Sequence, residues 1–176
     1  MTPKAVLDVV ILYNRAVGLH KDALLLEKTL AQAAKANGQS VGKVRHMDPR
    51  EVPVMCDIIV HLEIPYYAWI PYSRYNIMMI NPEWWVSEAY DPYLPAFDLI
   101  LFKNEEMKDL FKVVCGLDES KYSVVPWCCE EKKQSLREDA VREFLYLVGG
   151  SVNKANAAKS LVALWKESYP VLHIYT

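Results

Sequence analysis

The chain has 176 residues, of which 52% are hydrophobic, and its formal net charge is −2. This length fits one ordinary domain, or one domain and part of another, with enough apolar residues for a substantial core. The apolar content argues against disorder, and the balanced charge without a basic run argues against binding to nucleic acid.

Cysteine usage and hydropathy indicate where such a protein resides. The four cysteines form no CxxC pair and have no histidine or cysteine partner at zinc spacing, so we interpret them as reduced thiols in the cytoplasm and expect no metal site. The N-terminus lacks the pattern of a signal peptide. No apolar stretch reaches about 18 residues, which predicts that no segment spans a membrane.

The first part of the chain predicts alternating strands and helices. Residues 6–13 form a near-continuous apolar run, typical of a strand buried on both faces of a parallel sheet. A turn over residues 14–19 contains Gly18, and apolar residues at helical spacing then predict a helix over residues 20–36. Further strands are expected at residues 40–46, 57–62, 75–80, 99–102 and 122–125, with a helix at residues 105–114 before the last of them.

The last part of the chain forms a separate unit. Residues 130–142 are charged without a strand pattern, so we interpret them as a linker between a domain at residues 1–129 and a unit at residues 143–176. In that unit a short apolar strand stops at Gly149 and Gly150, and Ser151 is a natural N-cap for the helix that follows. A final strand is expected at residues 171–175.

The order of elements predicts a doubly wound, mostly parallel Rossmann-like α/β sheet with a truncated second βαβ unit. Ligands of such sheets bind outside the C-terminal ends of the strands. The first of these ends carries no GxGxxG motif, which argues against a dinucleotide dehydrogenase. Its single glycine, Gly18, permits either a close approach by a ligand or a turn with positive φ.

Lys154 lies in the first turn of the helix that follows the glycine turn. A helix start presents free N–H groups, and an anion, most often a phosphate, is its expected occupant. A cation there opposes the helix dipole by roughly 0.3–1 kcal/mol. One interpretation is that Lys154 and these N–H groups hold a diphosphate; the alternative is that Lys154 reaches into solvent, where screening makes the penalty small.

Three titratable residues near strand ends are candidates for acid/base chemistry. Glu63 and Glu83 follow apolar strands among aromatic residues, so burial could raise a carboxyl pKa. The alternative for either is an ion pair with Lys103 or Arg74, or a capping role. His61 lies within a strand, where a packed, hydrogen-bonded histidine is the alternative to a catalytic base.

Aromatic residues are dense between residues 66 and 93. Tyrosine and tryptophan suit both sugar rings and domain interfaces, so some of these side chains could face a ligand while most pack beneath a proline-rich loop. They are Tyr66, Tyr67, Trp69, Tyr72, Tyr75, Trp84, Trp85, Tyr90 and Tyr93.

Several stretches resemble GT-B glycosyltransferases of the family-4 type. Residues 6–41, with Asn14, Gly18 and His20, look like the opening of the family's N-terminal domain. Residues 81–85 (Asn-Pro-Glu-Trp-Trp) and 97–103 are similar to later stretches of some members. Residues 144–154 resemble the first strand and helix of its C-terminal domain, where a glycine turn followed by a lysine binds the donor's diphosphate.

The resemblance implies two facing Rossmann-like domains that transfer a sugar from a UDP- or GDP-type donor to a glycan or small-molecule acceptor, without a cofactor or an obligatory metal. It implies catalytic roles for Glu83, Glu63 and His61, and acceptor binding by Asn81, Trp84 and Lys103. It implies donor binding by Gly18, His20, Gly150, Ser151, Asn153 and Lys154. The rival hypothesis is a non-catalytic α/β module that binds carbohydrate or a protein through the aromatic region.

An isolated βαβ unit with a two-stranded sheet is marginal, because it leaves strand faces uncovered. We therefore expect residues 143–176 to dock on the first sheet, to pair with a second copy in a homodimer, or to be completed by a separate chain.

Overall fold

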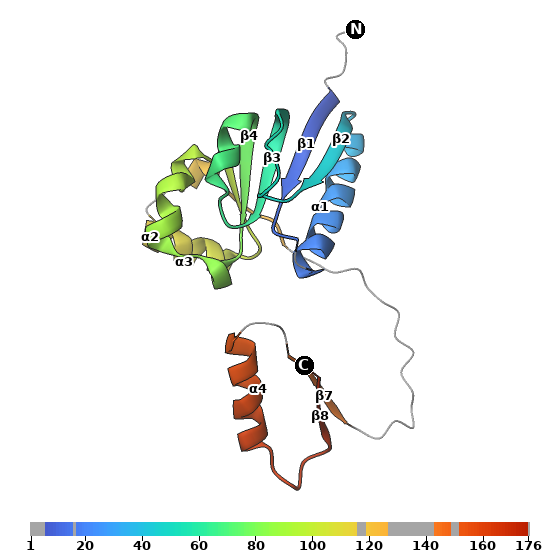
Figure 1. The fold of residues 1–176 in the computed structure, drawn as a ribbon, viewed down its shortest axis with the longest axis vertical. Helices are drawn as coiled ribbons and strands as arrows, with labels where there is room; N and C mark the ends of the chain where they lie inside the picture. Colours follow the sequence, from blue (N-terminus) through green and yellow to red (C-terminus); the bar gives the residue numbers. More distant parts are fainter. Residues whose placement is uncertain (1–5, 16, 116–118, 127–142, 149–151, 176) are drawn as a thin grey trace. The chain divides into compact units, whose positions relative to one another are not determined.

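The computed structural model describes residues 6–15, 17–115, 119–126, 143–148 and 152–175 (Figure 1). Contacts divide the chain into two compact units, Met1–Cys129 and Glu130–Thr176. Each unit is described by itself. The predicted linker over residues 130–142 and the turn residues Gly149, Gly150 and Ser151 lie outside the described residues.

The first unit contains a six-stranded sheet in the order β2-β1-β3-β4-β5-β6, and every neighbouring pair is parallel (Figure 1). This confirms the predicted Rossmann-like α/β fold with a mostly parallel sheet. The strands are β1 (Val6–Leu12), β2 (Ser40–Met47), β3 (Cys56–Glu63), β4 (Ser73–Ile80), β5 (Leu99–Phe102) and β6 (Tyr122–Val124). Because β2 and β3 flank β1 on opposite sides, the strand order reverses between β1 and β3, which is the topological switch point.

Helices and short 3-10 turns connect these strands. The longest is α1, which lies beside β2 (Figure 1) and contacts it. The connections are α1 (Val17–Ala36), η1 (Tyr67–Tyr72), η2 (Pro82–Trp84), α2 (Ser87–Tyr90), η3 (Asp91–Ala96), α3 (Glu105–Cys115) and η4 (Glu119–Lys121). The proline-rich region between β3 and β5 is therefore largely organised into short helical turns rather than one irregular loop.

The core confirms that β1 is buried on both faces. Val9 and Ile11 pack with Ala23 and Leu26 of α1 on one face. Val10 and Leu12 point to the other face, where they pack with Ile59 and Trp69. This alternation follows from the strand geometry, in which successive side chains leave opposite faces. A third cluster beneath β4 and β5 includes Phe97, Phe102 and Phe111.

The start of α1 corrects one prediction. The helix begins at Val17 rather than at residue 20, so the predicted turn over residues 14–19 is shorter than expected. Leu19 packs against the core cluster of β1 and α1, and this contact draws the first turn into the helix. Gly18 is therefore helical, and Gly38 is the glycine with positive φ among the described residues. The positive-φ interpretation of Gly18 is wrong.

The second unit is one βαβ element, with β7 (Phe144–Leu147), α4 (Val152–Leu164) and β8 (Leu172–Tyr175). β7 and β8 pair in parallel. Among the described side chains of α4, Ala158 is buried and Leu164 is exposed. The Trp165 ring lies 5.3 Å from the Phe144 ring between centroids. Within the described ranges of both units, no helix is both long enough and apolar enough to span a bilayer.

Candidate functional site

The C-terminal ends of β1, β2, β3 and β4 converge around the switch point. They bring together Tyr13 and the residues after it, the loop at residues 48–51, Glu63, and Asn81. In open α/β sheets this edge is where ligands bind. The candidate site is therefore assembled from these four strand ends and the first turn of α1.

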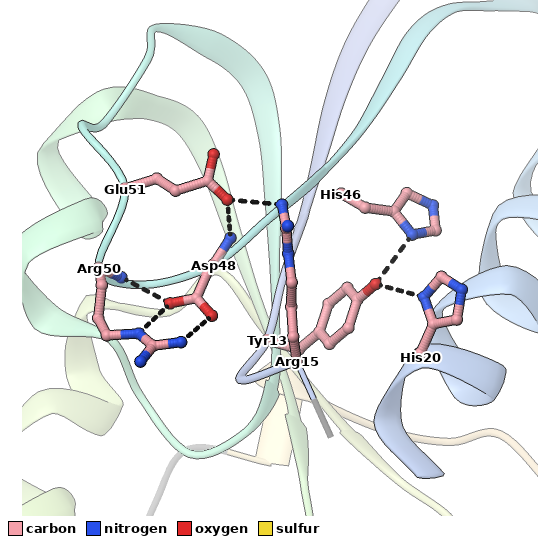
Figure 2. Close-up of polar contacts among 7 residues, drawn as sticks. All are labelled: Tyr13, Arg15, His20, His46, Asp48, Arg50 and Glu51. Carbon is pink, nitrogen blue, oxygen red and sulfur yellow. Dashed lines mark hydrogen bonds and ion pairs between the residues drawn. The ribbon is translucent and has the colours of Figure 1, made fainter. Parts of the chain in front are cut away.

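A buried tyrosine joins two histidines at this edge (Figure 2). Tyr13 directly follows β1 and is 2% exposed. Its hydroxyl lies 2.7 Å from Nδ1 of His20 on α1 and 3.2 Å from Nδ1 of His46 on β2. Nε2 of His46 lies 3.0 Å from Oε2 of Glu27. Glu27 also lies on α1, about two turns after His20. Glu27, His46, Tyr13 and His20 thus form a continuous line of hydrogen bonds, which we name the Tyr13 chain.

The Tyr13 hydroxyl keeps its proton. Burial raises the pKa of Tyr13, and the nearby positive charge of Arg15 lowers it by less. The phenol is therefore a neutral group that donates one hydrogen bond and accepts others.

The loop after β2 fixes the neighbouring charges (Figure 2). Arg50 donates to the buried Asp48 carboxylate from Nε and Nη2, each at 2.8 Å. These hydrogen bonds hold the pKa of Asp48 well below its usual range. Oε1 of Glu51 accepts from the Asp48 backbone N–H at 2.9 Å and from Nη2 of Arg15 at 2.7 Å. Both arginines are paired with acids of the same loop, so this part of the edge carries no excess positive charge.

Glu63 and Asn81 meet at the ends of β3 and β4. Nδ2 of Asn81 donates to Oε1 of Glu63 at 3.1 Å. Lys103 Nζ is 3.9 Å from Asp22 Oδ2, and the Arg74 guanidinium lies 5.3 Å from the Tyr75 ring centroid. The structure therefore brings a predicted catalytic residue next to a predicted acceptor-binding residue.

The backbone of Glu63 is strained. Its φ is 80°, and it is the one non-glycine residue with positive φ in the described part of the chain. For an L-residue this conformation costs roughly 1–2 kcal/mol. Such strain concentrates at functional sites, and here it falls at the C-terminal end of a central strand.

Replacing Glu63 with glycine and with alanine separates the strain from the side chain. Both variants lose the carboxylate, but only glycine adopts φ near 80° without steric cost. We expect the glycine variant to be more stable than the alanine variant by about 1 kcal/mol in urea unfolding. Equal stability of the two variants would show that no backbone strain is stored at this position.

His61 is fully buried and both of its ring nitrogens are used by the fold. The Tyr66 backbone N–H donates to Nδ1 at 3.1 Å, so Nε2 carries the hydrogen and donates to Oδ1 of Asn76 at 3.2 Å. Burial lowers the pKa of His61 to about 4, against a smaller raising effect of the Asn76 hydrogen bond. These contacts support the packed-histidine alternative rather than a catalytic base.

Other predicted residues have separate environments. Gly18 lies in the first turn of α1, and a Cβ built there meets nothing within 4 Å, so the fold itself does not require glycine. Trp84 is 55% exposed. Trp85 is partly buried and donates from Nε1 to Asp91 Oδ1 at 2.8 Å. Glu83 lies in η2, but its side chain falls outside the described residues.

The predicted donor residues are divided between the two units. Gly18 and His20 lie in the first unit, and His20 is exposed. In the second unit Lys154 is the third residue of α4 and is exposed, and the first turn of that helix contains no acidic residue. The Asn153 side chain lies outside what the structure describes.

Sequence patterns did not reveal the Tyr13 chain. Tyr13 is the last residue of an apolar run and was interpreted as part of the strand, whereas β2 has a weak apolar pattern that draws no attention to its end. A signal was present, because His46 and Asp48 stand at the end of a strand and must share an edge with Tyr13 if the two strands are parallel neighbours. That neighbour relation comes only with the strand order.

The described residues contain no group of three or more His, Cys, Asp or Glu side chains placed to hold a metal ion. Comparisons of the chain with models of known protein families, with curated proteins and with solved structures find no match. The fold defines the class as a Rossmann-like α/β protein, and a function has to be argued from the site.

Proposed function

We propose that this chain is a glycosyltransferase, or part of one, that moves a sugar from a UDP- or GDP-type donor to a glycan or small-molecule acceptor. The first unit would carry the acceptor side, and the second would begin the donor-binding domain. The observation that carries the proposal is the second parallel βαβ element, whose helix α4 has Lys154 in its first turn and no acid there. The resemblance to the GT-B family points the same way.

Sugar transfer from such a donor is favoured by positive electrostatic potential at the place where negative charge develops. As the bond between the anomeric carbon and the donor phosphate breaks, the leaving diphosphate gains charge. The N-terminal N–H groups of α4 and the Lys154 ammonium would stabilise that charge. An acid in the same turn would oppose it.

Glu63 is the residue of the first unit best suited to handle the acceptor. Its carboxylate accepts a hydrogen bond and, within reach of an acceptor hydroxyl, could take the proton as that oxygen attacks. Asn81 holds one carboxylate oxygen at 3.1 Å and so restricts the orientation of the group. Glu83 is the second carboxylate that we propose for this role. The donor is a substrate, and the proposal includes no cofactor.

The test is a binding titration of UDP, GDP, UDP-glucose and GDP-mannose by calorimetry. Lys154→Ala is expected to weaken the best of these ligands by roughly tenfold, equivalent to about 1.4 kcal/mol, and the difference should shrink as salt is added. Lys159→Ala is the matched control, because Lys159 is an exposed lysine further along α4. Its effect should stay within about twofold, since the helix dipole acts mainly over the first turn.

Two outcomes of this titration would contradict the donor-site proposal. If wild-type protein binds none of the four ligands, or if Lys154→Ala binds them as wild type does, the donor-site proposal is wrong.

A second candidate function is a carbohydrate-binding module without transfer activity. The observation in its favour is the exposure of aromatic side chains: Tyr67 is 63% exposed and stacks on Tyr93 with ring centroids 5.2 Å apart, and Trp84 is 55% exposed. Aromatic faces bind sugar rings. Such a module would bind glycans in the absence of nucleotide. Trp84→Ala would abolish that binding and Lys154→Ala would leave it unchanged.

A further inference from the structure

The hydrogens of the Tyr13 chain can be counted from one end to the other. The Glu27 carboxylate only accepts, so the contact of 3.0 Å with Nε2 of His46 requires a hydrogen on that nitrogen. A neutral imidazole carries one N–H, and Nδ1 of His46 is then an acceptor. The Tyr13 hydroxyl, 3.2 Å away, donates its single hydrogen to it.

The other histidine must take the opposite form. The Tyr13 hydroxyl donates its one hydrogen to His46. The contact of 2.7 Å between the Tyr13 oxygen and Nδ1 of His20 therefore requires His20 to donate. His20 therefore carries its hydrogen on Nδ1 and a lone pair on Nε2 when both histidines are neutral. The hydrogen bond made by one ring nitrogen thus decides whether the other ring nitrogen carries a hydrogen or a lone pair.

This assignment restricts what His20 can bind. A lone pair on Nε2 accepts a hydrogen bond from a hydroxyl or an N–H group. It repels the oxygens of a phosphate, which have no hydrogen to donate at neutral pH apart from a partly protonated terminal group. His20 is exposed at the C-terminal edge of the sheet, where its ring stacks on the Tyr13 ring with centroids 6.2 Å apart.

We propose that Glu27, His46 and Tyr13 are positioning residues that fix His20 in its Nδ1–H form, so that His20 Nε2 accepts a hydrogen bond from a sugar hydroxyl of the donor. The sugar part of this inference rests on the proposed function, whereas the tautomer part does not. His20 then recognises the sugar and makes no contact with the diphosphate.

The tautomer is measured directly by NMR on protein with ¹⁵N-labelled histidine at about pH 8, above the range in which free histidine titrates. We expect His20 to show a protonated Nδ1 and His46 a protonated Nε2. His61 serves as the internal reference, because Asn76 and the Tyr66 N–H fix its Nε2–H form. A protonated Nε2 on His20, or a doubly protonated His46, overturns the proposal.

Tyr13→Phe removes the hydroxyl and retains the ring. We expect the His20 nitrogens in this variant to move to the averaged shifts of an unconstrained imidazole, while the His61 signals stay in place and report that the sheet is folded. His20 shifts identical to those of wild type would show that Tyr13 does not position the ring. A structural role alone would not change the tautomer of a neighbouring exposed histidine in a folded protein.

The contact between His20 and the sugar is tested by comparing the binding of a nucleotide with that of its sugar conjugate: UDP with UDP-glucose, and GDP with GDP-mannose. Tyr13→Phe and His20→Ala are each expected to weaken the conjugate that wild type binds by roughly three- to tenfold, and to leave the free nucleotide unchanged. Equal weakening of both would place His20 on the phosphates and overturn the sugar contact. If wild type binds no nucleotide and no conjugate, the proposed function and the sugar contact both fail, and the NMR result alone decides the tautomer.

Discussion

Trp69→Ala is expected to lower the free energy of unfolding by about 3–5 kcal/mol. Trp69 lies in η1, is 1% exposed, and fills the face of the sheet opposite α1 against Val10, Leu12 and Ile59. Its Nε1 also donates to the Pro49 carbonyl at 3.1 Å. The substitution therefore leaves a cavity and an unpaired carbonyl together. Small domains are stable by about 5–15 kcal/mol, so a loss of this size is a large part of the total.

Urea unfolding followed by circular dichroism measures this loss, and Trp84→Ala is the matched control. Trp84 is 55% exposed, so its removal should change the free energy of unfolding by about 0.5 kcal/mol or less. Similar losses for the two variants would show that the face opposite α1 is not a packed core.

Acidification from pH 7 to pH 4 is expected to cost about 3 kcal/mol of stability through His61 alone. The pKa of His61 is about 4 in the folded protein and 6.5 for an unperturbed histidine. Between these values the unfolded chain binds a proton that the folded chain does not, so stability falls as the pH falls through this window. One pKa unit is worth about 1.4 kcal/mol, which gives the magnitude. Well below pH 4 both states are protonated and His61 contributes no further change.

The measurement is urea unfolding at a series of pH values for wild type and His61→Gln. The variant should be less stable at pH 7, because two buried hydrogen bonds are disturbed, but its stability should fall less steeply from pH 7 to pH 4. Asp48, whose pKa is held low by Arg50, contributes mainly below this window and so does not confuse the comparison. Parallel profiles for the two proteins would contradict the burial of a neutral histidine.

Strands with a strong apolar pattern were predictable from sequence. β5 has the predicted bounds, because four apolar residues stand between Asp98 and Lys103. β1 was recognised because burial on both faces leaves no polar alternation. The start of α1 was missed because it depends on the packing of Leu19 against a core cluster that includes residues far along the chain. Local pattern carries no information about such contacts.

The candidate site was only partly predictable. The rule that ligands bind at the C-terminal ends of parallel strands selected Glu63 and Asn81. The structure places these two residues in contact. The positive φ of Glu63 was not foreseeable, since its residue type does not favour that conformation. The Tyr13 chain depends on β2 lying beside β1 in a register that pairs His46 with Ile11. Alternation of strands and helices predicts a parallel sheet but does not say which strands are neighbours.

Tyr66 has a consequence for how the edge of the sheet responds to contact. Its hydroxyl accepts the Asn14 N–H at 3.2 Å, and its own backbone N–H donates to His61. Its ring stacks on the His61 ring with centroids 6.1 Å apart. The backbone at Asn14 is therefore connected through one aromatic residue to His61, near the C-terminal end of β3. These contacts join the loops after the first and third strands, so we expect a ligand that moves the Asn14 backbone to move Tyr66 as well.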